Sequence, residues 1–375
     1  MNSLALYIHI PWCIKKCPYC DFNSHAVTAE TPEKQYIETL LNDLSQDLQL
    51  LNKPNTVSSI FIGGGTPSLF SAESFDTLLQ GIAKLIPFDE SLEITLEANP
   101  GTFESQKFAD FRAIGINRLS IGIQSFNNRH LKKLGRVHSA EEALAAVEIA
   151  HKAGFDNFNL DLMFGLPDQT NREMLDDIQV AIKLQPSHIS FYQLTLEPNT
   201  YFHKFPPKLP ESDAIYTGQI QAQRALADAE YMQYEVSAYA KNNAKCQHNL
   251  NYWQFGDYLG IGAGAHGKLS ISQPENIVRS VKHKSPEQYL RDNSASLAEI
   301  SAIDLPLEYV MNQLRLKAGF NMKQYEIHTG LGADSLQPAL SDCVKEGLIK
   351  QQNDHYYCSD KGWDFLDYIL EKFMP

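Results

Sequence analysis

The stretch Leu4-Ala-Leu-Tyr-Ile-His-Ile-Pro-Trp-Cys13-Ile-Lys-Lys-Cys17-Pro-Tyr-Cys20 joins an apolar run directly to three cysteines. The run Leu4–Ile10 is typical of a buried β-strand. The cysteines follow on one short loop with the spacing C-x3-C-x2-C. Three thiolates placed in this way can hold three irons of a cubane cluster, which leaves the fourth iron open to an outside ligand. The stretch therefore predicts a [4Fe–4S] cluster held by Cys13, Cys17 and Cys20.

Two other interpretations of the three thiols stay open at this point. Zinc requires a fourth ligand, which His9 or His25 could supply, and the thiols could also be incidental. A tight group of cysteines in a cytosolic chain indicates metal or redox chemistry more often than disulfides. Cys343 and Cys358 lie far along the chain, and buried, inert thiols are the expectation for both.

Composition narrows the class of protein. The net charge of −13 argues against nucleic-acid binding, which requires a basic face. The first cation is Lys15, so we expect no signal peptide. Apolar runs do not approach the ~18 residues of a membrane span. We therefore expect a cytoplasmic chain, and its 375 residues suggest one large and one smaller domain.

Strand-like and helix-like segments alternate through the first two thirds of the chain. This pattern predicts a parallel sheet with right-handed crossovers. The six predicted strands are Leu4–Ile10, Val57–Gly63, Glu93–Ala98, Arg118–Gln124, Asn157–Phe164 and His188–Leu194. The predicted helices are Pro32–Gln49, Ala72–Leu85, Phe103–Ile114, Ala140–Ala153 and Arg172–Leu184. A partial (β/α)6 barrel fits the six units, although periodicity alone leaves an open doubly wound sheet as an alternative.

The pattern changes along the last third of the chain. We predict a partial barrel over residues 1–230, a barrel extension over 231–300 and a C-terminal domain over 301–375. Helices at Leu305–Leu316, Met322–Thr329 and Leu336–Glu346 precede a hairpin and a final helix from Asp360. This outline is that of a mainly helical, winged-helix-like module. Because the chain is acidic, we expect this module to pack as a lid and not to bind DNA.

Polar and glycine residues follow the predicted strands at their carboxyl ends, where parallel α/β folds bind ligands. Gly63-Gly64-Gly65 ends the second strand, and glycines let a backbone approach a ligand closely. Taken alone, the glycines could simply form a tight turn, and each later polar residue could be an ordinary turn residue. The polar residues at the later strand ends are Glu97, Gln124, Asp161 and Thr195.

Four segments together resemble the radical SAM family, in which a cluster binds S-adenosylmethionine (SAM). They are the cysteine stretch with Tyr7, Gly63–Pro67, Leu119–Gln124 and Asn159–Pro167. The resemblance covers nearly the whole chain and implies a partial (β/α)6 barrel whose SAM chelates the open iron. In this family the SAM contacts correspond here to Tyr7, Tyr19, Gly64, Gly65, Thr66, Glu97, Gln124, Arg136, Asp161 and Thr195.

More narrowly, the chain resembles the branch that contains oxygen-independent coproporphyrinogen III oxidases and heme chaperones. The oxidases carry a fourth cysteine two residues after the third, where this chain has Phe22. They also have a substantial segment before the cysteine motif, whereas twelve residues precede Cys13 here. Both differences favour the heme chaperones. An oxidase that decarboxylates propionates is the alternative, and a radical SAM enzyme with another substrate is a third possibility.

The stretch Cys246-Gln-His248-Asn-Leu-Asn-Tyr252-Trp253 is similar to the heme motif of those chaperones. His248 is predicted to bind heme iron, since imidazole is a common axial ligand, and the aromatic pair can cover a porphyrin. Cys246 and His266 are secondary candidates, and a core histidine and a glycine-rich turn are the plainer interpretations. The resemblance implies heme and acceptor hemoproteins as partners, with membrane respiratory enzymes as candidate acceptors and a homodimer left open. It assigns no catalytic residue.

Overall fold

The computed structural model describes residues 2–27, 31–51, 55–101, 106–271 and 276–375. Its main sheet has six parallel strands at the centre, which stand in the order in which they occur along the chain. They are β1 (Asn2–Ile10), β4 (Asn55–Gly64), β5 (Phe88–Ala98), β6 (Arg118–Gln124), β7 (Phe158–Phe164) and β8 (His188–Gln193). Because this order never reverses, it is that of a barrel and not of a doubly wound sheet. The predicted partial (β/α)6 barrel is confirmed.

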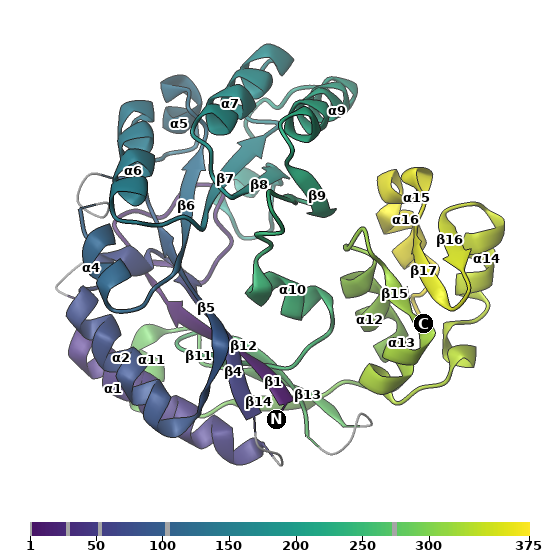
Figure 1. Cartoon of the computed structure of the whole chain (residues 1–375), viewed down its shortest axis with the longest axis horizontal. Helices are drawn as coiled ribbons and strands as arrows, with labels where there is room; N and C mark the ends of the chain where they lie inside the picture. Colours follow the sequence, from purple (N-terminus) through teal and green to yellow (C-terminus); the bar gives the residue numbers. More distant parts are fainter. Residues whose placement is uncertain (1, 28–30, 52–54, 102–105, 272–275) are drawn as a thin grey trace.

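The helices between these strands lie on the outer, convex face of the sheet (Figure 1). Successive right-handed crossovers return on the same side when neighbouring strands are also neighbours in sequence. The longer helices are α1 (Glu33–Asp47), α2 (Ala72–Leu85), α4 (Phe108–Ala113), α6 (Ala140–Lys152), α7 (Asn171–Lys183) and α9 (Ser212–Asp228). Shorter helical turns are η1 (Leu48–Leu50), η2 (Pro67–Leu69), α5 (Asn128–Lys133) and α8 (Tyr201–Lys204). The predicted helix Phe103–Ile114 is found from Phe108, and its residues 103–105 lie outside the described residues.

Local sequence signals explain where several of these helices begin and end. Ser139 and Glu142 form a reciprocal capping box at the start of α6, and Thr170 and Glu173 form another at α7. Gly154 follows α6 with φ of 80°, a left-handed conformation that favours glycine after a helix. These caps fix the lengths of the crossover helices and thereby the loops at the carboxyl ends of the strands.

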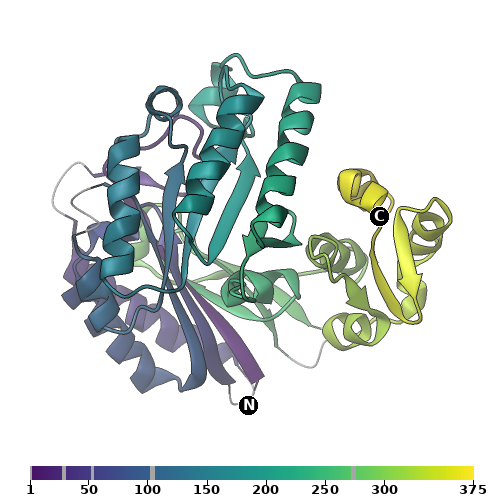
Figure 2. The same ribbon diagram turned by 45° about the horizontal axis from the view of Figure 1, so that its top comes forward.

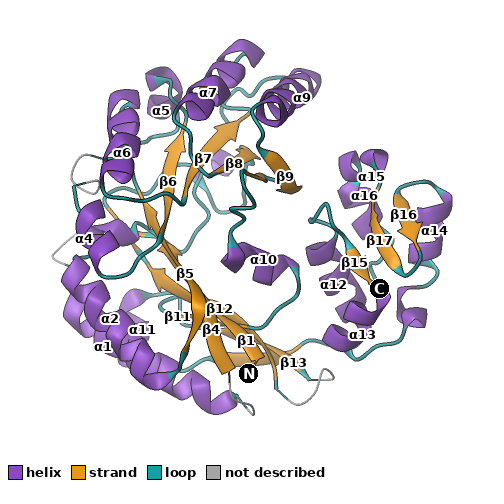
Figure 3. Ribbon diagram, viewed as in Figure 1, coloured by secondary structure: helices purple, strands orange, loops and turns teal. Residues whose placement is uncertain are grey.

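The sheet continues beyond the six parallel strands on both sides. On one side β11 (Tyr258–Ile261) pairs in parallel with β1, and an antiparallel series follows it. This series consists of β12 (His266–Ser270), β13 (Ile277–Val281) and β14 (Ser296–Glu299), with α11 (Pro286–Arg291) between the last two. On the other side β10 (Ala238–Ala240) and β9 (Met232–Glu235) extend β8. The short helix α10 (Gln247–Trp253) lies on the concave side (Figure 3).

The C-terminal region packs around a second buried cluster, which includes Tyr309, Phe320, Leu340 and Ile369 and reaches Phe255 and Ile277 of the barrel extension. Its helices are α12 (Leu305–Gln313), α13 (Met322–Thr329), η3 (Ala333–Leu336), α14 (Ala339–Lys345), α15 (Asp360–Asp364) and α16 (Leu366–Glu371). Its three-stranded sheet has the order β15 (Phe320–Asn321), β17 (His355–Cys358), β16 (Ile349–Gln352). Figure 2 shows this region beside the open side of the barrel. Helices followed by a hairpin match the winged-helix-like outline.

The C-terminal region is joined to the barrel through the residues that follow α12. The Arg315 guanidinium pairs with Glu235 at 3.1 Å and lies 4.3 Å above the ring centre of Trp253. Lys317 donates a backbone hydrogen bond to Tyr234 at 3.0 Å. The end of α10 is therefore held between the barrel and the C-terminal region. Within the described part of the chain, the helices are all too short or too polar to cross a membrane.

Candidate functional site

The cysteine loop begins where β1 ends and is fixed at both of its ends. Cys13 closes the short strand β2 (Trp12–Cys13), which pairs in parallel with β3 (His25–Ala26). Val27 donates a backbone hydrogen bond to Cys13 at 2.9 Å, and Thr66 donates one to Trp12 at 2.7 Å. The Cys13 side chain is buried, whereas Cys17 and Cys20 are partly exposed. The loop thus holds its three thiols at the carboxyl end of the sheet without closing them off from a ligand.

All three thiols line one cavity of about 430 Å³. Most of the residues predicted for SAM line the same cavity, although they come from the cysteine loop after β1, from the five later strands or the loops that follow them, and from the loop after α5. They are Tyr19, Gly64, Gly65, Thr66, Glu97, Gln124, Arg136, Asp161 and Thr195. Tyr7, predicted with them, lines an adjoining cavity instead. The structure therefore brings together nine of the ten residues implied for SAM, beside the thiols implied for the cluster.

His9, one of the two histidines that could complete a zinc site, is already hydrogen-bonded within the protein. Both ring nitrogens of His9 are used, in bonds of 2.9 Å to the Tyr7 hydroxyl and to the Asn23 carbonyl. Across the described residues, no three Cys, His, Asp or Glu side chains converge as ligands of one ion. A cubane instead needs its thiolates spread over three irons. Arg136 donates a hydrogen bond to the Cys17 sulfur at 3.8 Å.

Burial works against ionisation of the other two thiols. It raises the pKa of Cys13, which a hydrogen bond from Thr66 partly offsets. Burial likewise raises the pKa of Cys20, and the Ser24 hydroxyl, 3.7 Å from its sulfur, acts in the opposite direction. Iron coordination deprotonates thiols outright. We therefore expect the loop to release protons when the cluster is assembled.

The backbone N–H groups of the glycine turn already have partners within the protein. Gly64 donates to Glu97 Oε2 at 3.0 Å, Gly65 to Ile10 at 2.7 Å and Thr66 to Trp12. The Gly64 N–H therefore already meets a carboxylate of the protein itself, that of Glu97. A Cβ on Gly64, where φ is 115°, would lie 2.5 Å from the His9 ring, so packing also requires glycine. Carbonyl acceptors suit an amino group of a ligand.

Two partly buried carboxyl groups, those of Glu97 and Asp161, line the cavity. Burial, reinforced by the charge of Asp161, raises the pKa of Glu97 to about 7. Burial also raises the pKa of Asp161, which accepts hydrogen bonds from Ser120 at 3.0 Å and Asn159 at 2.8 Å. These acids line the same cavity as the guanidinium of Arg136. A ligand with both cationic and anionic ends, as SAM has, matches this arrangement.

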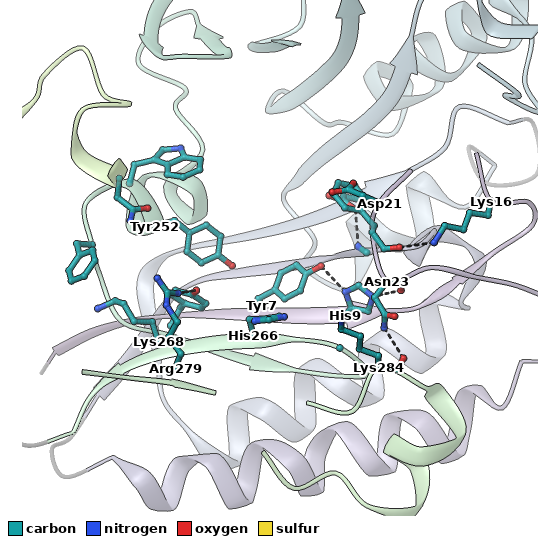
Figure 4. A pocket seen from close by; sticks show the side chains of 18 residues that line it. Tyr7, His9, Lys16, Asp21, Asn23, Tyr252, His266, Lys268, Arg279 and Lys284 are labelled. Carbon is teal, nitrogen blue, oxygen red and sulfur yellow. Dashed lines mark hydrogen bonds between the residues drawn. The ribbon is translucent and has the colours of Figure 1, made fainter. Parts of the chain in front are cut away.

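A second and larger cavity, of about 650 Å³, adjoins the first and shares Gly64, Glu97 and Phe22 with it. It lies between the barrel and the C-terminal region, since Asn312 of α12 lines it. Its wall is rich in aromatic side chains, namely Tyr7, Phe22, Tyr252, Trp253, Phe255 and Tyr258. Figure 4 shows His266 close to Tyr7 on the strand side of this cavity. The size and lining suit a flat aromatic ligand.

His248 lies behind this wall and not on it. It is 1% exposed, and burial lowers its pKa to about 3. Its Nδ1 is 3.1 Å from the Ser59 hydroxyl, and its Nε2 is 2.8 Å from the Tyr252 hydroxyl. Both nitrogens are thus occupied, and binding iron would break one of these bonds. The role of His248 as an iron ligand stays a prediction, and the contact seen here is with Tyr252.

The remaining cysteines are buried or partly buried away from both cavities. The Cys246 sulfur is 3.6 Å from Glu93, and burial raises the pKa of Cys246 to about 12. Cys343 is in the buried cluster of the C-terminal region and Cys358 packs against it. Cys246 is therefore a structural contact of α10 in this conformation.

Sequence reasoning missed several residues of the two linings. Asn99 bridges Arg136, at 2.6 Å, and Thr66, at 3.0 Å, beside the thiols. Asn99 lies two residues after Glu97, just beyond the end of a strand, and this position could have identified it as a candidate. Lys284 and Arg279 line the larger cavity from the antiparallel extension. The sequence carried no such signal for these two.

Comparisons with known proteins agree with this geometry. A family model described as the radical SAM superfamily matches residues 7–181, and the HemN C-terminal domain matches residues 300–365. The chain is 50% identical to a protein of Haemophilus influenzae named heme chaperone HemW, over 100% of this chain and 98% of that one. It is 46% identical to a heme chaperone HemW of Escherichia coli, over 100% and 99% of the two chains.

Among solved structures, coproporphyrinogen III oxidase (HemN) from Escherichia coli, described as a radical SAM enzyme, has a TM-score of 0.83. The match covers 99% of this chain and 90% of that one at 22% identity. At this identity the likeness concerns the fold alone. It extends over the barrel and the C-terminal region together.

Proposed function

Because this chain belongs to the HemW family of heme chaperones, we propose that it binds heme and passes it to acceptor hemoproteins. The observation that carries the proposal is the pair of adjoining cavities. One collects three cysteines and the residues implied for SAM, and the other is large, aromatic and open to the C-terminal region. An enzyme acting on SAM alone would not need the second cavity. Heme is a flat aromatic ligand, which matches the aromatic lining of the second cavity.

The resident cofactors are a [4Fe–4S] cluster and SAM, which the radical SAM family implies. Cys13, Cys17 and Cys20 would hold the cluster, and bound there it supplies one-electron chemistry. We propose that carbonyls of the glycine turn and the carboxyl of Glu97 receive the amino end of SAM. Arg136 faces the same space and would bind its carboxylate.

Tyr252 and Trp253 are proposed to cover one face of the heme. Tyr252 is held from behind by His248, and Trp253 is held by the guanidinium of Arg315. Each ring is therefore fixed before heme arrives, and a wall ordered in advance costs less to bind. Phe22 adds an exposed ring where the related oxidases have a cysteine.

We further propose that the chaperone works in the cytoplasm, since its six cysteines are all free thiols. Membrane respiratory enzymes are proposed acceptors. We also propose that the chain forms a homodimer, and a measurement of its molecular mass in solution would test this.

The decisive experiment compares the chaperone with the alternative oxidase in parallel assays. Heme-loaded, cluster-containing protein is mixed with the apo form of a b-type cytochrome, and the cytochrome spectrum is followed against equimolar free heme. We expect faster or more complete loading than from free heme. The same protein, given coproporphyrinogen III, SAM and a reductant, should leave this porphyrinogen unconverted. Conversion to protoporphyrinogen IX without heme transfer would establish the oxidase instead.

A further inference from the structure

His266 is a histidine of the larger cavity whose ring is free to bind a ligand. It begins β12, its side chain is exposed, and it lines the cavity. Among the described residues, the ring has no hydrogen-bond partner. Burial lowers the pKa of His266, and the charges of Lys284 and Arg279 lower it further. Both effects favour the neutral imidazole, which is the form that binds iron.

The backbone that carries His266 is held rigidly by four side chains. Gly262 donates hydrogen bonds to Asp43 at 3.2 Å and to Tyr289 at 3.1 Å, and Ala263 donates one to Tyr36 at 2.8 Å. Asn23, three residues after Cys20, donates to the Ala263 carbonyl at 2.8 Å. The turn before His266 is thus fixed to the cysteine loop. A ligand placed on so rigid a base needs little ordering when it binds a metal.

Two lysines at one end of the cavity lack an ion-pair partner within the described chain. Lys284 and Lys16 are both exposed, and Lys16 donates only to the Phe22 carbonyl at 3.0 Å. The other two cations of the lining are neutralised, since Lys268 pairs with Asp257 at 2.9 Å and Arg279 pairs with Glu308. In Figure 4, Lys284 and Lys16 lie on one side of His266, and Lys268 and Arg279 lie on the other. Asp21 and Glu97 are the acids of the same lining.

We propose that His266 is the axial ligand of heme iron and that Lys284 and Lys16 bind the two propionates. This inference rests on the proposed heme chaperone function and deepens it by naming the groups that hold the cargo. Heme carries both propionates on one edge, so two free cations at one end of an aromatic cavity set its orientation. The opposite, apolar edge then points away from these two lysines, and Tyr252 and Trp253 cover one face of the ring. His248 acts as a positioning residue through its bond to Tyr252.

The ligand is identified from the spectra of three histidine variants, each measured with ferric heme on cluster-containing protein. The variants are His266→Ala, His248→Gln and His151→Ala, the last on the outer face of helix α6 as a matched control. His266→Ala should change the Soret band and the heme EPR signal and weaken binding by roughly tenfold or more. Added imidazole should restore the wild-type spectrum in this variant, because it fills the space of the lost ring. His266→Met keeps a ligand and should give a different, sulfur-type spectrum.

His248→Gln separates the two histidines. It should bind heme less tightly but keep the wild-type iron spectrum, since Tyr252 and not the metal loses its partner. A changed spectrum in His248→Gln, with His266→Ala unchanged, would overturn the assignment while leaving heme binding intact. Absence of heme binding by the unaltered chain would be a different failure, that of the chaperone function itself.

The propionate contacts are tested by charge reversal. Lys284→Glu should weaken heme binding by roughly tenfold or more. Lys84→Glu, on the outer helix α2, makes the same change in net charge and should have no effect. The heme dimethyl ester, which has no carboxylates, should bind both Lys284→Glu and wild type equally. A loss of ester binding in Lys284→Glu would contradict the propionate role.

Discussion

At the scale of single residues, the three thiols of the loop differ from the other cysteines by facing a cavity. Replacing Cys13, Cys17 or Cys20 by Ala removes one of three iron ligands, so the protein should lose the absorption near ~400 nm that iron–sulfur clusters show. Cys343→Ala and Cys358→Ala are matched controls, since both thiols pack within the C-terminal region. Iron content and absorption after anaerobic reconstitution measure the effect. A cluster lost from Cys343→Ala and kept in Cys17→Ala would contradict the assignment.

Glu97 makes the stability of the apoprotein depend on pH. Its pKa is raised by burial and by Asp161 from 4.5 to about 7 in the folded state. The folded chain therefore binds more protons than the unfolded chain between these values, and stability falls as the pH rises through them. Glu97→Gln removes the charge and keeps the shape. At pH 8.5 this variant should be more stable than wild type by up to about 3 kcal/mol, at ~1.4 kcal/mol per pKa unit.

Chemical unfolding of cluster-free, reduced protein at several pH values measures this difference. Well below pH 4.5 the two proteins should be equally stable, because Glu97 is then protonated in both the folded and the unfolded chain. Glu38→Gln, at an exposed position of α1, serves as the control. If the difference in unfolding free energy between wild type and Glu97→Gln does not change with pH, the role assigned to Glu97 is wrong.

The sequence identified the cysteines and the polar strand ends because parallel strands bring their carboxyl ends to one edge. It could not foresee that the glycine N–H groups are used internally, since Ile10, Trp12 and Glu97 reach them only in the folded chain. For the same reason, the burial of His248 against Ser59, from a strand far away in sequence, was not predictable. Lys284 and Arg279 carried no local signal because the antiparallel extension places them.

At the scale of elements, a buried cluster of charges joins α1 to the segment after β13. The Lys282 ammonium pairs with Asp43 and, at 2.8 Å, with Asp47, and all three side chains are almost fully buried. Tyr289 of α11 donates to Asp43 at 2.5 Å. Asp43 also holds the turn before His266 through Gly262. The cluster therefore connects the outer helix layer to the strand that carries His266.

Lys282→Met should destabilise the protein by about 3–5 kcal/mol, because it leaves two buried carboxylates without a counter-charge. Lys183→Met, on the exposed face of α7, is the control and should change stability little. Thermal and chemical unfolding measure both. The loss of stability should be smaller at low pH, since protonated carboxyl groups need no counter-charge. Adding Asp43→Asn and Asp47→Asn to Lys282→Met should recover part of the lost stability. A penalty that these additions leave unchanged would contradict the charge argument.

Periodicity was sufficient for the regular strands and helices of the barrel, whose apolar runs and caps are local signals. It was not sufficient for β11, which pairs in parallel with β1 across most of the chain, or for β12 to β14. Those strands are short, and their partners are set by tertiary packing. Strand order, which decided between barrel and doubly wound sheet, is likewise a property of the folded chain. The predicted divisions at residues 230 and 300 stay a prediction.

At the scale of the whole molecule, two cavities meet at Gly64 and Glu97. One is built by strand ends of the barrel, and the other is closed by α10 and the C-terminal region. A ligand in the larger cavity would therefore lie directly beside SAM in the smaller one. The contacts of Arg315 with Glu235 and Trp253 join the two parts of the chain.

The most direct test is an anaerobic heme titration of cluster-containing protein, followed at the Soret band, for wild type and Asn312→Trp. Asn312 reaches the cavity from α12, and a tryptophan there would fill part of its space. Wild type should saturate at about one heme per chain, the stoichiometry of a single specific site of this size. Asn312→Trp should bind heme much more weakly and keep its cluster absorption. Unsaturable binding by wild type, or equal binding by Asn312→Trp, would contradict heme binding in this cavity.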